Sequence, residues 1–428
     1  MSVLTTAITG VTSEMQGVGR MDDGRAVFVS GALPGEKVTF EITKDAGRFC
    51  TARLAEVLEA SPQRIAPDCP YYERCGGCQL RHVTYEGALE MKRIRVADAL
   101  TRIAGLTDPL VRQTLGSDIQ LRTRNKAEYP ILNGHVGVHS GRGVVEIQDC
   151  LLQHPLSIGV LRAAAPQIAK SSIRSGWLVT RVTRNGDVMV ILSCEGRAPA
   201  WLASMAKLPG VRSVYHCALN RRPAHALDGI CRKVSGEDVL TEILCGLRFN
   251  ISPQTFFQVN TPQAEKLYEI ALDVADISTS SRVLDAYCGC GTITLAAAGR
   301  AAYALGVEIV PPAIEDAKRN AVANDLAHKT GFVCADAAKE IPARIGRGEQ
   351  FDCVIVDPPR KGCDAALINA LGISKPPRIS YVSCDPGTLA RDIKLLAEQG
   401  YRLKWAQPAD MFPGTAHDET VAYLSRAH

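Results

Sequence analysis

The chain has 428 residues, 46% of them hydrophobic and 22% charged, which are values of ordinary globular proteins and exclude disordered, collagen-like and coiled-coil chains. No apolar run is long enough to span a bilayer, and the first residues lack the pattern of a secretion signal, so we expect a cytoplasmic protein without membrane contact. Positive charge concentrates in residues 74–248, with 24 Lys and Arg against 14 Asp and Glu, although the whole chain carries only +4. Such a region suits a polyanionic partner or, equally well, is a solvated basic surface.

Three regions follow one another along the chain. Residues 1–60 alternate short strand-like runs with Gly, Pro and Asp-rich turns, which predicts a small closed β-barrel, either five-stranded and OB-like or SH3-like. Residues 61–250 predict a central α+β region that begins with a Cys-rich loop and a helix over 85–103. From 251 to 428, helices and short apolar strands alternate, which predicts a doubly wound, mainly parallel α/β sheet.

A glycine-rich loop stands at 283–296, VLDAYCGCGTITLA. A buried strand should end near Asp285, after which Gly289 and Gly291 let the backbone turn tightly beside a ligand, and Thr292 is a candidate N-cap of the next helix. The next strand ends at Glu308, where nucleotide-binding α/β folds place an acid on ribose hydroxyls. The spacing D-x-x-x-G-x-G, in place of G-x-G-x-x-G, favours S-adenosylmethionine (SAM) over a dinucleotide.

Two later strands should bring reactive groups to the same sheet edge. FDCVIVDPPRKG ends in Asp357 and two prolines, which stop the strand and form a rigid lip. RISYVSCDPGTLARD places the thiol of Cys384 at a helix N-terminus that favours the thiolate, as a nucleophile requires. The loop before the last strand offers three candidate proton acceptors, among which the residues alone do not choose: His417, Asp418 and Glu419.

The 15 Cys form an odd set unlike a secreted disulfide framework, so most should be reduced thiols. Cys69, Cys75 and Cys78 follow the spacing C-x5-C-x2-C, and Cys150 is the expected fourth ligand of a metal site. Four thiolates suit a tetrahedral zinc or a [4Fe-4S] cluster, and spacing does not separate the two. Without a metal, three Cys in a Gly- and Pro-rich loop would be open to oxidation.

In chain order, the motifs C-x5-C-x2-C, RTRNKAEYPI, IQDCLLQ, SPQTFFQVN, LDAYCGCGTITL, VDPPRKG, YVSCDPGTLARD and DMFPGTAHDETV resemble the bacterial RNA uracil-5-methyltransferase family. The similarity covers nearly the whole chain and points to the branch with an N-terminal TRAM barrel and an iron-sulfur cluster, which modifies 23S ribosomal RNA. It implies a TRAM barrel over 1–60, a central domain with a [4Fe-4S] cluster over 61–250, and a Rossmann-like SAM-dependent methyltransferase domain over 251–428.

The resemblance also implies roles for single residues. Cys384 would be the nucleophile and Glu419 the base, and the cluster ligands would be Cys69, Cys75, Cys78 and Cys150. Besides the loop glycines, the implied SAM contacts are Gln258, Tyr287, Thr292, Glu308, Asp336 and Asp357.

Two residues depart from the family pattern, and the substrate has alternatives. Asp385 replaces the usual Asn, and its charge should raise the pKa of Cys384; Thr292 replaces the commoner Asn. The implied enzyme is a monomer acting on 23S rRNA. The alternatives are the same reaction on the T-loop uridine of tRNA, and a non-catalytic, redox-responsive RNA-binding or assembly protein.

Overall fold

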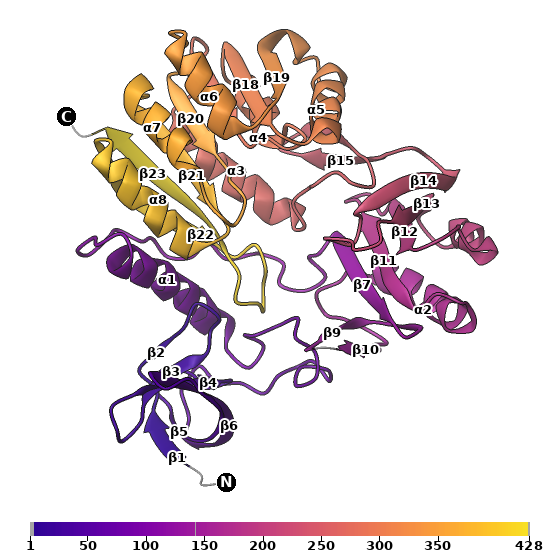
Figure 1. Ribbon diagram of the computed structural model, residues 1–428, viewed down its shortest axis with the longest axis vertical. Coiled ribbons are helices and arrows are strands. Elements are labelled where there is room, and N and C mark those ends of the chain that lie inside the picture. Colours follow the sequence, from indigo (N-terminus) through magenta and orange to yellow (C-terminus); the bar gives the residue numbers. More distant parts are fainter. Residues whose placement is uncertain (1–3, 142, 427–428) are drawn as a thin grey trace.

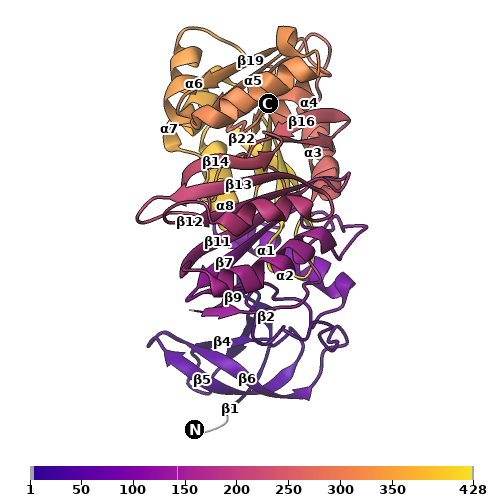
Figure 2. The same ribbon diagram turned by 90° about the vertical axis from the view of Figure 1, so that its right-hand side faces the viewer.

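The computed structural model describes residues 4–141 and 143–426, arranged as a barrel at one end, a large sheet at the other, and a central region beside both (Figures 1 and 2). Within these ranges no helix has the length and apolar character needed to cross a membrane.

The N-terminal region is a single curled sheet with the order β1-β5-β6-β4-β3-β2. The hydroxyl of Thr6 in β1 donates to the backbone oxygen of Arg20 in β3 at 2.8 Å, which closes the curl, and Val27, Val29 and Phe40 fill its interior. The expected barrel is present, and it has six strands in the described residues because the two-residue β2 pairs with β3. Its strands are β1 (Leu4–Ala7), β2 (Gly10–Val11), β3 (Gly17–Arg20), β4 (Ala26–Ser30), β5 (Lys37–Asp45) and β6 (Phe49–Glu59).

The central region is a six-stranded sheet with the order β14-β13-β12-β11-β7-β8. The helices α2 (Pro155–Lys170) and η1 (Ala200–Lys207) pack on one of its faces through Leu161, Ile168 and Leu202. Its strands are β7 (Lys126–Leu132), β8 (His135–Val136), β11 (Ser175–Val182), β12 (Val188–Cys194), β13 (Val211–Leu219) and β14 (Gly229–Gly236). Two hairpins flank it: β9 (Val138–Ser140) with β10 (Gly143–Val145), and β15 (Leu240–Leu244) with β16 (Leu247–Ile251).

The C-terminal sheet has seven strands in the order β19-β18-β17-β20-β21-β23-β22. The first five are parallel and the last two are antiparallel, so the carboxyl ends of the parallel strands share one edge with the start of β23. Its strands are β17 (Arg282–Ala286), β18 (Tyr303–Glu308), β19 (Thr330–Cys334), β20 (Cys353–Val356), β21 (Arg378–Ser383), β22 (Tyr401–Ala409) and β23 (Glu419–Arg426).

Helices cover both faces of this sheet, as the alternating pattern predicts. On one face lie α3 (Thr261–Ala275), α4 (Thr292–Ala298) and α5 (Pro311–Ala323). On the other lie α6 (Ala337–Gly346), α7 (Ala365–Ser374) and α8 (Pro386–Glu398). The helix α1 (Tyr85–Arg102) joins this second layer, because its Val96 and Leu100 are fully buried in the same core.

Candidate active site

The loop after β17 is held in an unusual backbone conformation. Tyr287, Gly289 and Gly291 have φ values of 71°, 53° and 84°. Only Tyr287, which has a Cβ, is strained by this conformation, and such strain collects at ligand sites. A Cβ on Gly291 would lie 3.1 Å from Ala317 and Phe332, whereas a Cβ on Gly289 would meet nothing within 4 Å. The loop is therefore packed tightly on one side and leaves open space on the other.

The residue after the loop differs from its expected role. Gly291 is the N-cap of α4, and Thr292 is already the first helical residue. The Thr292 hydroxyl lies 3.1 Å from the hydroxyl of buried Tyr268 instead of capping the helix. The expectation that Thr292 caps α4 is wrong because the left-handed conformation at this position is one that glycine adopts without strain.

Two carboxylates lie next to the loop in the sheet, at the end of β18 and in β17. Glu308, at the end of β18, accepts hydrogen bonds from the backbone N–H of Gly289 (3.2 Å) and of Val310 (2.9 Å). Asp285 is fully buried; one of its oxygens accepts from the Thr294 hydroxyl at 2.6 Å, and the other has no partner. Burial raises the pKa of Asp285 to about 8. An unpartnered buried carboxylate oxygen is well suited to a cationic ligand such as SAM.

The other residues implied for SAM lie along the same sheet edge. Gln258 is buried ahead of α3, and its backbone oxygen accepts from the Asn125 side chain at 2.8 Å. Asp336 follows β19 and caps α6 by accepting from the backbone N–H of Ala338 at 3.0 Å. Asp357 follows β20, and burial raises its pKa to about 7.

Strand register brings Cys384 and Glu419 together. In the antiparallel pairing of β21 with β23, Ser383 lies opposite Thr420. One further step along each strand places Cys384 opposite Glu419. Glu419 is only 6% exposed, and Cys384 is half-buried. The Glu419 carboxyl and the Cys384 thiol therefore lie near Asp357, which follows β20, the strand next to β21. These three residues are called the corner below.

The electrostatics of this corner raise the pKa values of both groups. Burial, then the Glu419 and Asp357 carboxylates, raise the pKa of the Cys384 thiol to about 12. Burial and Asp357 also raise the pKa of Glu419 well above its usual range, while Arg360 lowers both pKa values. Arg360 follows the two prolines of VDPPRKG, and the sequence alone assigned it no role.

The expectation that the N-terminus of α8 favours a Cys384 thiolate is wrong. The N-terminus of α8 does not leave Cys384 as a thiolate, because the Asp385 carboxylate occupies it and accepts from the Thr388 N–H at 2.8 Å. Burial first, and then the Glu419 and Asp357 carboxylates, raise the pKa of Cys384. The expected effect of the Asp385 charge on that pKa stays a prediction.

The three candidate proton acceptors separate clearly in the structure. Asp418 accepts from the Arg95 guanidinium at 2.9 Å and from the Thr420 hydroxyl at 3.0 Å, so its carboxylate is occupied. His417 contributes its backbone oxygen to Lys92 at 2.7 Å. Glu419 raises the pKa of Cys384 more than any other single residue does, so its carboxylate lies near the thiol.

Comparison with known proteins assigns the chain to a family. The TRAM domain profile matches residues 2–55, and the tRNA (uracil-5-)-methyltransferase profile matches 344–427. Uncharacterized RNA methyltransferases of Halalkalibacterium halodurans and Caldanaerobacter subterraneus are 37% and 38% identical, over 99% and 98% of this chain and 96% and 97% of theirs. The chain belongs to the RNA uracil-5-methyltransferase family. The family resemblance seen in the sequence is thus confirmed, and SAM is the methyl donor.

A solved structure agrees with this assignment of the methyltransferase. The tRNA (uracil-54, C5)-methyltransferase of Pyrococcus abyssi, in complex with S-adenosyl-L-homocysteine, is 26% identical. The similarity covers 98% of this chain and 100% of that one, with a TM-score of 0.78.

The Cys-rich loop of the methyltransferase lies against the segment that carries Cys150. The backbone N–H of Gln148 donates to the Tyr71 hydroxyl at 3.0 Å, and that of Gly76 donates to the His139 oxygen at 3.1 Å. Burial and the nearby Cys150 thiol raise the pKa of Cys78 to about 12. The donor set suits iron and sulfide, yet in the described part of the chain no three Cys, His, Asp or Glu side chains converge as metal ligands.

Proposed function

We propose that this methyltransferase converts a uridine of 23S rRNA to 5-methyluridine through a covalent adduct on Cys384. The observation that carries the proposal is that Cys384 and Glu419 lie opposite each other at the sheet edge that holds the glycine loop. The rRNA assignment is supported by the TRAM barrel together with the C-x5-C-x2-C motif, the combination typical of the rRNA-modifying branch.

The Cys384 thiolate starts the reaction because uracil C5 is too poor a nucleophile to be methylated unaided. The sulfur adds to C6, and the electrons of the C5=C6 bond spread as an enolate onto C5. SAM, when bound, supplies the electrophilic methyl group. Arg360 is the cation that favours ionised Cys384 and Glu419, since it lowers the pKa of both.

Glu419 then completes the reaction. Its carboxylate takes the proton from C5, the C–H electron pair re-forms the C5=C6 bond, and the C6–S bond breaks with its electrons returning to Cys384. A raised pKa suits a group that must accept a proton and hold it. The uridine must be unpaired or flipped out, because a stacked base does not reach this corner.

The basic central region would hold the RNA backbone. Arg221 and Arg222 are exposed after β13, and a hollow of about 420 Å³ beside them is lined by Trp177, His139 and Asn220. Guanidinium groups bind phosphates and aromatic rings stack on bases, so this end of the central sheet offers both kinds of RNA contact.

We assign a [4Fe-4S] cluster to Cys69, Cys75, Cys78 and Cys150. The support is an all-thiol donor set on two loops that hydrogen bonds tie together. Anaerobically purified protein should contain about four irons and four sulfides per chain. Stoichiometric zinc without sulfide would overturn the assignment.

Transfer of labelled methyl groups from SAM to purified RNA transcripts tests which RNA is the substrate. We expect 23S rRNA to accept methyl groups, and RNA from cells lacking the protein to have lost one or more 5-methyluridines from 23S rRNA. Methylation of tRNA alone would favour the T-loop uridine, the alternative that the similarity to the Pyrococcus abyssi enzyme supports. Transfer to neither RNA would favour the non-catalytic alternative.

A further inference from the structure

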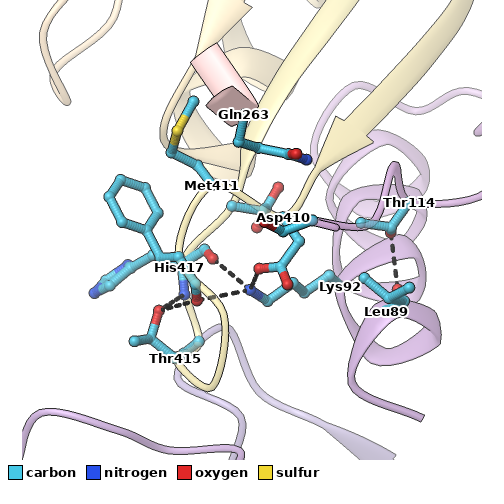
Figure 3. Close-up of polar contacts among 12 residues, drawn as sticks. Leu89, Lys92, Thr114, Gln263, Asp410, Met411, Thr415 and His417 are labelled. Carbon is cyan, nitrogen blue, oxygen red and sulfur yellow. Dashed lines mark hydrogen bonds and ion pairs between the residues drawn. The ribbon is translucent and has the colours of Figure 1, made fainter. Parts of the chain in front are cut away.

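A buried lysine on α1 forms hydrogen bonds with the loop that leads to Glu419 (Figure 3). Lys92 is 1% exposed, and its ammonium donates to Asp410 Oδ1 at 2.5 Å, to the His417 oxygen at 2.7 Å and to the Phe412 oxygen at 3.3 Å. The loop 410–418 leaves β22 and returns to β23 at Glu419. One ammonium therefore joins the start, the middle and the end of this loop.

Neighbouring groups hold the same loop from the same side. The Tyr85 hydroxyl donates to Asp410 Oδ2 at 2.9 Å. The Arg95 guanidinium donates to the Asp418 carboxylate and to the Ala416 oxygen. All these contacts come from α1, so residues more than 300 positions away in the sequence help to fix the path of the chain into Glu419. Asn260 also holds this loop by donating to the Met411 oxygen at 3.1 Å.

We propose that Lys92 and Asp410 are positioning residues that fix loop 410–418 in the shape that aims Glu419 at the C5 proton. The proposal rests on the function proposed above for Cys384 and Glu419. Without Lys92, the Asp410 carboxylate and two backbone oxygens lose a buried donor, so the loop loosens beside the base. Cys384 follows β21 instead, and no hydrogen bond of Lys92 reaches it.

The two halves of the reaction should therefore respond differently to loss of Lys92. Addition of Cys384 to C6, with the thiol proton passing to water, and methylation of C5 do not need Glu419 as a base. The last step does: Glu419 takes the C5 proton, the C–H pair forms C5=C6, and the C6–S pair returns to sulfur. A displaced carboxylate should stall the enzyme at the methylated adduct, because a displacement of about 1 Å can slow a step roughly a hundredfold.

The test compares Lys92→Met with Thr114→Val. The Thr114 hydroxyl donates to the Leu89 oxygen of the same helix at 2.8 Å, so its loss removes a hydrogen bond beside the loop without removing a donor to it (Figure 3). Adducts that resist denaturation are quantified on ordinary RNA and on RNA with 5-fluorouridine, whose C5–F bond blocks the last step in any variant. S-adenosylhomocysteine affinity is measured by calorimetry.

For Lys92→Met we expect product release to slow by about ten- to hundredfold, adducts to accumulate on ordinary RNA, and the 5-fluorouridine adduct to form at the wild-type rate. Thr114→Val should turn over like wild type, and neither change should alter S-adenosylhomocysteine affinity. Wild-type turnover by Lys92→Met, or an equal loss of both kinds of adduct, overturns the proposal.

Two further variants separate misfolding of Lys92→Met, and failure of the proposed function, from failure of the positioning role. If Lys92→Met does not fold, Lys92→Met/Asp410→Leu replaces the buried pair with apolar groups, an exchange that proteins often tolerate, and the same stalled adduct is expected. Glu419→Gln should also stall as the adduct. If Glu419→Gln and the wild type give no adduct even with 5-fluorouridine, the proposed function fails; if only Lys92→Met behaves as wild type, the positioning role alone fails.

Discussion

Asp285 should release a proton when the methyl donor or its product binds. Its carboxyl is fully buried, has one unpartnered oxygen, and has a pKa raised to about 8 by burial. At pH 7 a group with that pKa is about 90% protonated, whereas at pH 9 it is about 10% protonated. The ammonium of S-adenosylhomocysteine favours the carboxylate, so binding should release up to about 0.9 proton at pH 7 and about 0.1 at pH 9.

Calorimetry in buffers of different ionisation enthalpy measures this release directly. Asp285→Asn keeps an acceptor for the Thr294 hydroxyl but removes the titrating carboxyl. The variant should therefore lose the part of the proton release on ligand binding that comes from Asp285. It should also weaken binding by roughly ten- to hundredfold, the cost of losing a charged hydrogen bond. Asp22→Asn, an exposed carboxylate on the barrel, is the matched control and should bind like wild type. Equal proton release by wild type and Asp285→Asn would refute the reasoning.

Three further predictions concern the corner, the loop and the RNA surface. Iodoacetamide should modify Cys384 slowly at pH 8, where a pKa of about 12 leaves about one thiol in ten thousand ionised, and Asp357→Asn should speed it by lowering that pKa; an unchanged rate would contradict the electrostatics. Gly291→Ala should lower the unfolding free energy by about 1–3 kcal/mol in urea titrations, more than Gly289→Ala, because only Gly291 lacks room for a Cβ; the reverse order would be inconsistent with the loop geometry. Binding of rRNA fragments should weaken steeply between 50 and 200 mM salt. The double variant Arg221→Ala/Arg222→Ala should reduce the slope of log binding constant against log salt concentration by about two, one for each lost phosphate contact. An unaltered slope would show that these two residues do not bind RNA phosphates.

Local patterns were enough to predict much of the fold. The helix expected over 85–103 is α1, and the loop glycines, Glu308, Asp357 and Cys384 stand at strand ends as expected, because apolar runs and turn residues act over short distances. The helix α6 is weakly marked in the sequence, since Pro342 inside it interrupts the helical signal.

Long-range contacts account for what the sequence did not reveal. The pairing of Cys384 with Glu419 depends on the antiparallel register of β21 and β23, which is set by packing between distant segments. The role of Asp385 as a helix cap also required the structure, because its charge suggested a different effect. Lys92 did leave a signal: it stands four residues after Ala88 and four before Val96, on the buried face of α1.

The most direct test of the account is to map the covalent bond. A 23S rRNA fragment with 5-fluorouridine, incubated with the methyltransferase and SAM, should give an adduct that resists denaturation and whose digested peptide carries the modified, methylated pyrimidine on Cys384. Cys384→Ala should give none while still binding S-adenosylhomocysteine. An adduct on another residue, or normal methylation by Cys384→Ala, would contradict the central role assigned to this thiol.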